Sequence, residues 1–248
     1  MSLASDIHLP ALQLVNVSMG YRGAAGVVPV LHEVSVGFPE RAMTAVMGPS
    51  GSGKTTLLHC AAGLERPVGG KVFLGSTELA DSDERELTTI RRSRIGFVFQ
   101  QFNLLPMLTV YENVGLPLRL DGRRVKRQVV MEALRQVGLE DKAGRRPAQL
   151  SGGQQQRVAI ARTLAAEPEI VFADEPTGSL DRSTGRQVMD LLRRAVDKAG
   201  RTVVMVTHDP LAAAYADRVI FLVDGRITGK IDHPTADEVA VELSRWEL

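Results

Sequence analysis

The sequence predicts an α/β fold in which a mostly parallel central sheet is joined to an N-terminal antiparallel β layer and a helical insertion. Three observations predict it. Short strand-like segments crowd the first 47 residues, helical patterns dominate residues 109–166, and strands alternate with helices from residue 169 onward. Strands separated by helices of this length imply a parallel sheet. We therefore expect a single domain over residues 1–248, with the helical insertion at about residues 95–166.

The N-terminal strands are predicted from alternation and residue content. Residues 12–19 alternate weakly, residues 34–38 alternate clearly, and residues 42–47 form a short run typical of a buried strand. Because these segments follow one another so closely, we expect them to form the antiparallel layer. Two further strands are predicted at residues 69–74 and 95–99, the second from its β-branched and aromatic content.

Capping signals mark the helices. Thr109 and Glu112 form a capping box, and Gly138 ends a predicted helix whose apolar face holds Val125, Val129, Ala133, Leu134 and Val137. Farther along, the pattern predicts strands at residues 169–175, 202–208 and 218–223, with helices between them at residues 183–200 and 210–216.

Another capping box opens residues 150–157 (LSGGQQQR), where Ser151 is the N-cap and Gln154 follows three residues later. This local pattern leaves Gly152 and Gly153 unexplained. Each glycine in a helix costs up to about 1 kcal/mol relative to alanine. We therefore expect another group to approach this backbone closely.

The balanced charge of the chain implies no strongly charged partner. The 248 residues carry 30 Lys and Arg against 29 Asp and Glu, which leaves a net charge of +1. Aromatic residues make up only 4% of the chain, so basic groups are interpreted as solvated helix faces rather than as a nucleic-acid surface. These groups are Arg91, Arg92 and Arg94; Arg123, Arg124, Lys126 and Arg127; and Arg193 and Arg194.

The cysteine content fits a reducing compartment, and the hydropathy pattern shows no membrane span. Cys60 is the single cysteine, which rules out an intrachain disulfide framework, and its apolar surroundings predict a buried, unreactive thiol. The N-terminus (MSLASDIHLP) does not resemble a signal peptide, and no apolar run reaches the roughly 18 residues that a spanning helix needs. We expect a chain that is soluble by itself and that reaches a membrane only through a partner.

Residues 48–55 (GPSGSGKT) match the phosphate-binding pattern G-x-x-x-x-G-K-[ST] between a predicted strand and a predicted helix. Glycines let backbone N–H groups point at phosphate oxygens, and the start of a helix favours anions. Lys54 is expected to reach the β- and γ-phosphates, and Thr55 is expected to hold Mg²⁺. The predicted nucleotide-binding residues here are Gly48, Pro49, Ser50, Gly51, Ser52, Gly53, Lys54, Thr55 and Thr56.

Two acidic residues end the predicted strand in IVFADE. Four apolar residues bring Asp174 to the carboxyl end of that strand, where its carboxylate can hold Mg²⁺ directly or through water. Glu175 follows it and is the candidate to polarise an attacking water. The guanine-reading motif N-K-x-D is absent, which argues against a GTPase.

With these residues in place, the chain resembles the ATP-binding subunit of ABC transporters, which has a P-loop NTPase fold of ABC type. The resemblance runs from about residue 12 to about residue 231. Its most specific element is LSGGQQQR, the family signature, placed after the phosphate loop and shortly before IVFADE. EPTGSLD and VTHD complete the series in the family's order. The resemblance implies an ATPase that uses ATP and Mg²⁺.

The resemblance also implies individual roles. Tyr21 would stack on adenine, although packing is the alternative for a lone tyrosine after a strand. Gln100 would sense Mg²⁺ and the attacking water, and His208 would contact the γ-phosphate. Ser151, Gly152, Gly153 and Gln154 would bind the γ-phosphate of the ATP held by a partner subunit, and Asp181, also a nucleotide-site residue, would reach across to that subunit. Two ATP molecules would then lie between two subunits. The family implies a homodimer, or a pair with a similar ATPase, attached through an integral membrane permease to the cytoplasmic face of the cell membrane.

Within the family, the chain looks most like the branch of lipoprotein-releasing, macrolide-export and cell-division ATPases. Ser179, Val68 and Gly69 depart from residues common in that branch, without touching the chemistry. No regulatory or fused membrane domain is expected after residue 231. Residues 236–248 are expected to form a short amphipathic helix that docks on its own domain, with membrane contact as the alternative. The apolar segment after Gln100 either lines a groove for the permease or packs inside the helical part: Phe102, Leu104, Leu105, Met107 and Leu108.

Three functions compete. The first is a motor subunit for export or for extraction from the membrane. The second, an ABC ATPase of DNA repair or translation, lacks support because the chain has neither a long coiled coil nor a second cassette. The third is a mechanotransmitting or signalling ATPase that moves a membrane partner without transport. The sequence does not separate the first from the third.

Overall fold

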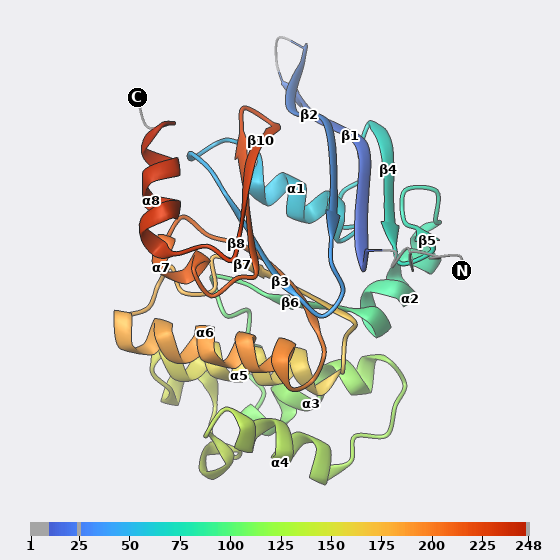
Figure 1. The fold of residues 1–248 in the computed structure, drawn as a ribbon. Coiled ribbons are helices and arrows are strands. Elements are labelled where there is room, and N and C mark those ends of the chain that lie inside the picture. The colour runs from blue at the N-terminus through green and yellow to red at the C-terminus, as the bar shows by residue number, and fades with distance from the viewer. Residues whose placement is uncertain (1–9, 24–25, 247–248) are drawn as a thin grey trace, which may run out of the picture.

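A computed structural model describes residues 10–23 and 26–246, which form two sheets and eight α-helices in that part of the chain (Figure 1). The smaller sheet is antiparallel, in the order β2-β1-β4-β5. Its strands are β1 (Leu12–Gly23), β2 (Gly26–Phe38), β4 (Gly69–Leu74) and β5 (Thr77–Glu78). The prediction that the N-terminus is not a signal peptide concerns residues 1–10, most of which lie outside the described residues.

The larger sheet has six strands in the order β10-β9-β3-β8-β7-β6, and every pair except β10–β9 is parallel. Its strands are β3 (Met43–Met47), β6 (Ile95–Val98), β7 (Ile170–Asp174), β8 (Thr202–Val206), β9 (Arg218–Val223) and β10 (Arg226–Asp232). The predicted fold class, a mostly parallel sheet with an antiparallel N-terminal layer, is confirmed.

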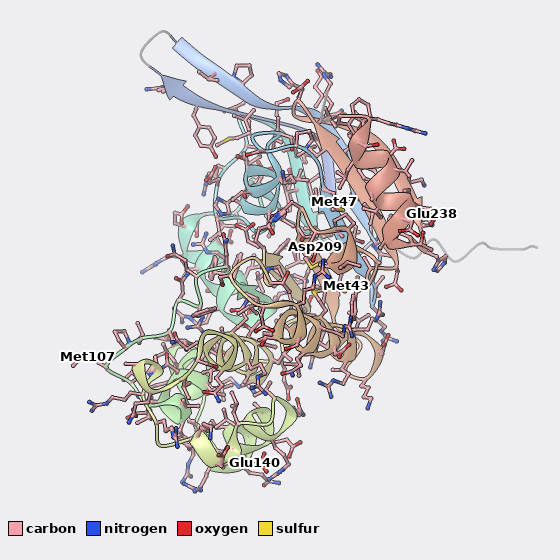
Figure 2. The ribbon with its side chains drawn as sticks, turned by 90° about the vertical axis from the view of Figure 1, so that its left-hand side faces the viewer. Met43, Met47, Met107, Glu140, Asp209 and Glu238 are labelled. Carbon is pink, nitrogen blue, oxygen red and sulfur yellow. The ribbon has the colours of Figure 1, made fainter. Side chains whose placement is uncertain are left out.

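The placement of β3 corrects one prediction. Residues 42–47 were expected in the antiparallel layer, but β3 lies in the larger sheet, parallel to β8 on one side and to β9 on the other. All five of its residues are buried, and Figure 2 shows Met43 and Met47 inside the body of the molecule. A strand covered on both faces belongs to a parallel sheet, and closeness along the chain does not override that requirement.

The helix that follows the phosphate loop, α1 (Lys54–Ala61), buries Leu57 and Leu58 in a core that includes residues of both sheets. Cys60 is buried in the same core, and this burial raises the pKa of its thiol to about 12, as expected for an unreactive cysteine. A second helix, α2 (Glu84–Arg94), was not predicted from the sequence, although the capping box of Asp83 and Glu86 marks its start.

The helical part contains α3 (Val110–Leu120), α4 (Arg127–Gln136) and α5 (Gly152–Ala165), with two short 3₁₀ turns at Glu140–Lys142 and Pro147–Gln149. The predicted capping box of Thr109 opens α3. The predicted face of α4 needs correction: Val125 precedes the helix, and its buried residues are Val130, Ala133 and Leu134. The helix is shorter than its apolar pattern because its N-cap, Lys126, has extended backbone.

The remaining helices lie where the pattern placed them. The long helix α6 (Arg182–Asp197) runs beside α5 beneath the larger sheet (Figure 1). After β8 come α7 (Pro210–Ala213) and, near the C-terminus, α8 (Ala236–Ser244). Val239 of α8 is fully buried in the main core, which agrees with docking on its own domain. No described helix is long and apolar enough to cross a membrane.

Candidate active site

The phosphate-binding loop leaves the carboxyl end of β3 and enters α1, as the motif requires. Gly48 has φ 148°, and a Cβ there would lie 1.9 Å from the carbonyl oxygen of Leu222. Gly53 has φ 98°, caps α1 without a side chain, and leaves the first N–H groups of the helix open to an anion. The hydroxyl of Ser52 is buried without a hydrogen-bond partner. This loop fits a phosphate group.

Lys54 carries the positive charge of the loop. Its Nζ donates hydrogen bonds to the carbonyl oxygens of Gly48 (2.9 Å) and Pro49 (2.7 Å). Burial lowers the pKa of this amine, while the carboxylates of Glu175 and Asp174 act in the opposite direction. The ammonium group is thus held over the loop by carbonyl oxygens that a phosphate can replace.

Asp174 and Glu175 stand at the carboxyl end of β7, next to the end of β8. Burial raises the pKa of Asp174, opposed by the nearby charges of His59 and Lys54. Glu175 has φ 46°, and its N–H donates to Val206 on β8 (2.9 Å). Nδ1 of His208 donates to Oε1 of Glu175 at 2.9 Å. The sheet therefore joins two predicted catalytic residues that are 33 positions apart.

Gln100 follows β6, the neighbour of β7 at the sheet edge. A Cβ at Gly178 would lie 3.0 Å from Nε2 of Gln100, and the N–H of Gly178 donates to the carbonyl of Glu175 (3.1 Å). Gln100 is therefore close to the segment that follows Glu175, which is in turn bound to His208. The fold places all three predicted catalytic residues at the same edge of the larger sheet.

Sequence reasoning missed Gln156, a fully buried polar residue of α5. Its Nε2 donates to the carbonyl oxygens of Phe99 (3.3 Å) and Pro176 (2.7 Å). These carbonyls directly precede Gln100 and directly follow Glu175. We call these two hydrogen bonds of Gln156 the Gln156 clamp. A glutamine beside the apolar run of α5 was the signal that could have revealed it.

The signature segment begins α5 as predicted, with Ser151 accepting from the N–H of Gln154 (3.3 Å) and Gln154 accepting from the N–H of Ser151 (3.1 Å). A Cβ at Gly153 would lie 2.1 Å from Cγ2 of Thr184 on α6, so close helix packing explains one glycine of the pair. At Gly152 the nearest atom would be Cζ of Phe102 at 3.5 Å, an ordinary contact. Gly152 is therefore the glycine that the chain's own packing leaves unexplained.

Asp181 caps α6. Its carboxylate accepts from the N–H and hydroxyl groups of both Ser183 and Thr184, and these hydrogen bonds, led by the Thr184 hydroxyl, hold its pKa far below the usual range. Within the described residues, no hydrogen bond joins residues 150–157 or Asp181 to the phosphate loop. The signature segment and the phosphate loop are therefore separate surfaces of one chain.

Tyr21 lies beside α1. Its hydroxyl donates to Oε2 of Glu65 (2.5 Å) and shares a hydrogen bond with the hydroxyl of Thr56 (3.2 Å). The side chain is 42% exposed, so packing does not account for the whole ring. The tyrosine is thus attached to the helix that carries Lys54 and Thr55.

The oxygen groups beside the loop suit a magnesium ion that shares its ligands with phosphate and water. Thr55 is the second residue of α1, and the charge of Lys54 acts on Asp174. No cluster of three or more His, Cys, Asp or Glu side chains that could hold a metal occurs among the described residues. Mg²⁺ commonly binds through one or two protein oxygens together with substrate phosphates, and the residues present fit that mode.

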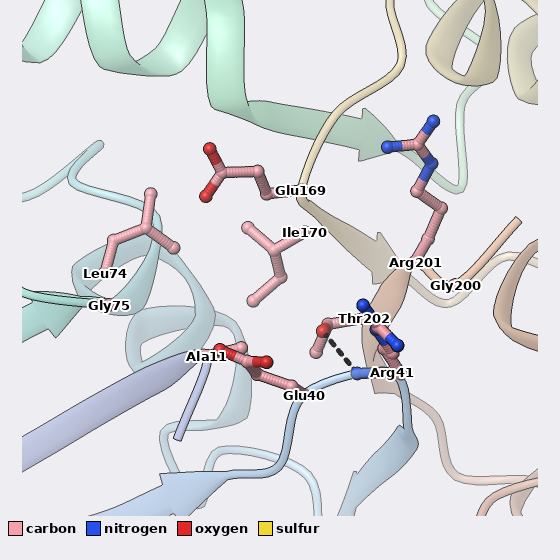
Figure 3. A pocket seen from close by; sticks show the side chains of 10 residues that line it. All are labelled: Ala11, Glu40, Arg41, Leu74, Gly75, Glu169, Ile170, Gly200, Arg201 and Thr202. Carbon is pink, nitrogen blue, oxygen red and sulfur yellow. Dashed lines mark hydrogen bonds between the residues drawn. The ribbon is translucent and has the colours of Figure 1, made fainter. Parts of the chain in front are cut away.

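The opposite edge of the larger sheet holds a cavity of about 230 Å³ (Figure 3). Glu169 and Thr202 line it at the starts of β7 and β8, and Thr202 accepts from the N–H of Arg41 at 3.0 Å. Ligands of open α/β sheets bind outside the carboxyl ends of the strands. The carboxyl edge, which carries the phosphate loop, Asp174 and Glu175, is therefore the candidate active site.

The segment after Gln100 divides between the two expected roles. Leu104 packs against the main core, whereas Leu105 is 45% exposed and Met107 is 78% exposed, standing out from the helical part in Figure 2. Phe102 lies beside Gly152. Part of the segment therefore completes the core, and part remains open on the surface.

A glycine loop over a helix N-terminus, with two carboxylates and a histidine at neighbouring strand ends, defines a nucleotide-hydrolysing protein of the α/β class. The family described as ABC transporter matches residues 31–178, and the chain belongs to that family. It is the ATP-binding domain, and its activity is ATP hydrolysis.

Relatives in several organisms support this assignment. The chain is 46% identical over 222 residues to the uncharacterized ABC transporter ATP-binding protein MJ0796 of Methanocaldococcus jannaschii, covering 87% of this chain and 94% of that one. It is 44% identical to the lipoprotein-releasing system ATP-binding protein LolD of Anaeromyxobacter dehalogenans, over 93% and 98% of the two chains. The macrolide export ATP-binding/permease protein MacB of Burkholderia thailandensis is 42% identical over 92% of this chain and 35% of its own.

A solved structure agrees with the fold in detail. The chain is similar, with a TM-score of 0.83 and 43% identity, to a dimeric post-hydrolysis state of the ATP-binding cassette MJ0796 bound to ADP and Pi. The match covers 90% of this chain and 99% of the other. Together with the LolD and MacB relatives, it confirms the branch that the sequence resembles.

Proposed function

We propose that this chain is the motor subunit of an ABC transporter complex, in which two copies, or one copy and a similar ATPase, close on two ATP molecules. The pair drives a separate integral membrane permease at the cytoplasmic face of the cell membrane, in export or in extraction of a substrate from the membrane. The dimeric MJ0796 cassette and the names of LolD and MacB support this proposal.

The phosphate loop, residues 48–56, holds the triphosphate in this proposal. Lys54 exchanges its loop carbonyls for phosphate oxygens, and the free hydroxyl of Ser52 gains a partner. Thr55 and Asp174, with Gln100, hold Mg²⁺, which when bound supplies positive charge to the phosphates. Tyr21 stacks on the adenine ring. The residues 1–248 act as one domain in which residues 95–166 carry the signature segment.

One observation carries the catalytic part of the proposal: the 2.9 Å hydrogen bond between His208 and Glu175 at the carboxyl ends of β7 and β8. A glutamate whose side chain is 18% exposed can accept a proton from water, and the histidine fixes which oxygen points outward. Gln100 lies near enough to orient that water. This arrangement makes Glu175 the general base and His208 the residue that aligns it.

The signature segment supplies the second half of the site. Ser151 and the N–H groups around Gly152 and Gly153 form an anion site at the start of a 14-residue helix, separate from the loop of their own chain. In the proposed pair they contact the γ-phosphate held by the other subunit, with Gln154 and Asp181 nearby. Hydrolysis removes this bridging phosphate and opens the pair, a change driven by differential contacts.

Glu175→Gln tests this function. The variant keeps its shape and binds ATP, but loses the carboxylate that takes the proton, so steady-state turnover should fall by about 100-fold or more. Because ATP persists, the variant should form a dimer on light scattering when ATP is added. Glu140→Gln, in an exposed turn of the helical part, is the matched control and should hydrolyse at the parent rate. Parent-level turnover of Glu175→Gln would remove Glu175 from the mechanism.

A further inference from the structure

The outer part of the β1–β2 hairpin is held to the body by few contacts. We call residues 20–23 and 26–29 the hairpin arm. Its strands pair only with each other, from Gly20↔Pro29 to Gly23↔Gly26, because the pairing of β1 with β4 ends at Ser18↔Gly69. Figure 1 shows this arm projecting beyond the sheet. A two-stranded hairpin is only marginally stable in water.

Tyr21 lies on the hairpin arm, opposite Val28. Among the described residues of the arm, it makes the only side-chain hydrogen bonds to the body, those to Glu65 and Thr56. Val27 and Val28, across the arm, are more than half exposed and offer little packing to fix it. The tyrosine hydroxyl is therefore the principal tether between the arm and α1.

Glu65 is built into the turn that ends α1. Gly63 has φ 63°, and the N–H groups of Leu64 and Glu65 both donate to the carbonyl of His59, at 2.9 and 3.3 Å. This turn brings Glu65 back along the helix. Its Oε1 then lies 3.0 Å from Nδ1 of His59, and its Oε2 accepts from Tyr21 at 2.5 Å. Both carboxylate oxygens are engaged, so the side chain has a fixed direction.

We propose that Glu65 is a positioning residue for ATP recognition, holding the Tyr21 ring over α1 at the height where the adenine of a bound ATP lies. This inference rests on the proposed adenine contact of Tyr21. His59 orients one carboxylate oxygen of Glu65, and the other oxygen accepts the hydrogen bond of the Tyr21 hydroxyl. The same hydroxyl shares a hydrogen bond with Thr56, the residue that follows Thr55 on α1. The base contact and the triphosphate contact are thus carried by one helix.

The positioning role of Glu65 concerns nucleotide binding and is distinct from the hydrolytic step. Glu65 makes no hydrogen bond to the phosphate loop or to Glu175 in the described residues, and its one link toward the carboxylates is His59, whose charge acts on Asp174. Its loss therefore acts mainly through Tyr21. Loss of the Glu65 side chain weakens the contact with the adenine base, because a hairpin arm without its tether must be ordered each time a nucleotide binds. ATP affinity depends on the tether, and the affinity for inorganic triphosphate, which has no base, does not.

The experiment compares Glu65→Ala and Tyr21→Phe in the full chain. Tyr21→Phe keeps the aromatic ring and removes only the hydroxyl. Both variants should weaken ATP binding and raise KM by about tenfold, the usual effect of losing a hydrogen bond to a charged group. Both should keep kcat and the Kd for inorganic triphosphate within about twofold of the parent. The double variant should bind ATP no more weakly than either single one, because the two changes remove the same contact.

Two further variants make the result specific. Glu65→Gln retains a hydrogen-bonding side chain of the same reach, and it should restore most of the affinity for ATP. Glu78→Ala removes a glutamate of the same antiparallel sheet that is paired with Lys71 at 3.0 Å, and it should bind ATP as the parent does. A merely structural role of Glu65 would instead lower the unfolding midpoint and weaken ATP and triphosphate alike.

Tyr21→Ala distinguishes failure of this inference from failure of the adenine role. If Tyr21→Ala binds ATP like the parent, the adenine contact and the positioning role are both wrong. If Tyr21→Ala weakens ATP binding while Tyr21→Phe and Glu65→Ala match the parent, the ring acts without its tether, and only the role of Glu65 is overturned. Equal losses of ATP and triphosphate affinity in Glu65→Ala also overturn it.

Discussion

Single glycines in this chain serve different physical purposes. Gly48 gives room for the carbonyl of Leu222, and Gly153 gives room for the methyl group of Thr184, whereas Gly152 faces only an ordinary contact with Phe102. The adjacent glycines of the signature segment therefore separate into one that the fold needs and one that a ligand can use.

Alanine substitutions test this division. Gly153→Ala should lower the free energy of unfolding by about 1–3 kcal/mol, the usual range for overpacking, measured by urea denaturation. Adding Thr184→Ser, which removes the clashing Cγ2, should recover most of that loss. Gly152→Ala should unfold like the parent and lose ATP-dependent pairing. Equal destabilisation by both alanines would contradict the division.

At the scale of elements, hydrogen bonds connect the ends of β6, β7 and β8 to one another and to α5. The strand ends carry Gln100, Glu175 and His208, and α5 reaches across through Gln156 to the backbone beside two of them. The same helix begins at Ser151. In the proposed mechanism, a shift of α5 would therefore be transmitted through Gln156 to the backbone beside Gln100 and Glu175.

Gln156→Met tests the clamp. Methionine fills a similar volume, yet it leaves the buried carbonyl of Pro176 and the partly buried carbonyl of Phe99 without a donor, so the free energy of unfolding should fall by about 1–3 kcal/mol. Because these carbonyls flank Gln100 and Glu175, kcat should fall as well, while the Kd for ATP stays near the parent value. Gln128→Met, on the exposed side of α4, is the control for both measurements. A loss of stability with an unchanged kcat would restrict Gln156 to holding the fold.

At the scale of the whole molecule, the phosphate loop and the signature segment lie on different surfaces, and in the proposed function each supplies half of an anion site. The loop connects the carboxyl end of β3 to the start of α1, and the signature segment begins α5 in the helical part (Figure 1). A pair of chains related by a two-fold axis can bring each loop to the other chain's signature segment.

Ser151→Arg tests the pairing. The exposed position accepts a long cationic side chain, so the monomer should fold and bind ATP with the parent Kd. The bulk at the surface should block closure, and ATPase activity should fall to background. In a Glu175→Gln background, light scattering with ATP should show monomers only. Weaker ATP binding by the monomeric variant would instead mean that the signature segment acts on its own chain's nucleotide.

Much of the site could be predicted because its chemistry is local. The phosphate loop needs glycines and a lysine at fixed spacing, and the capping boxes at Thr109 and Ser151 need only neighbouring residues. The acidic residues at the end of β7 follow from an apolar run that stops at Asp174. Gln156 escaped prediction because its partners, Phe99 and Pro176, are distant in sequence.

The sequence by itself determined which groups are present: a loop for phosphate, two carboxylates after a buried strand, a histidine after the next strand, and a helix start with paired glycines. Only the tertiary structure decided which of them meet. It moved β3 into the parallel sheet, joined His208 to Glu175, set Thr184 against Gly153, and attached Tyr21 to Glu65. The physical reason is that local spacing fixes backbone chemistry, whereas contacts between distant residues depend on the strand order and helix packing that bury both faces of a sheet.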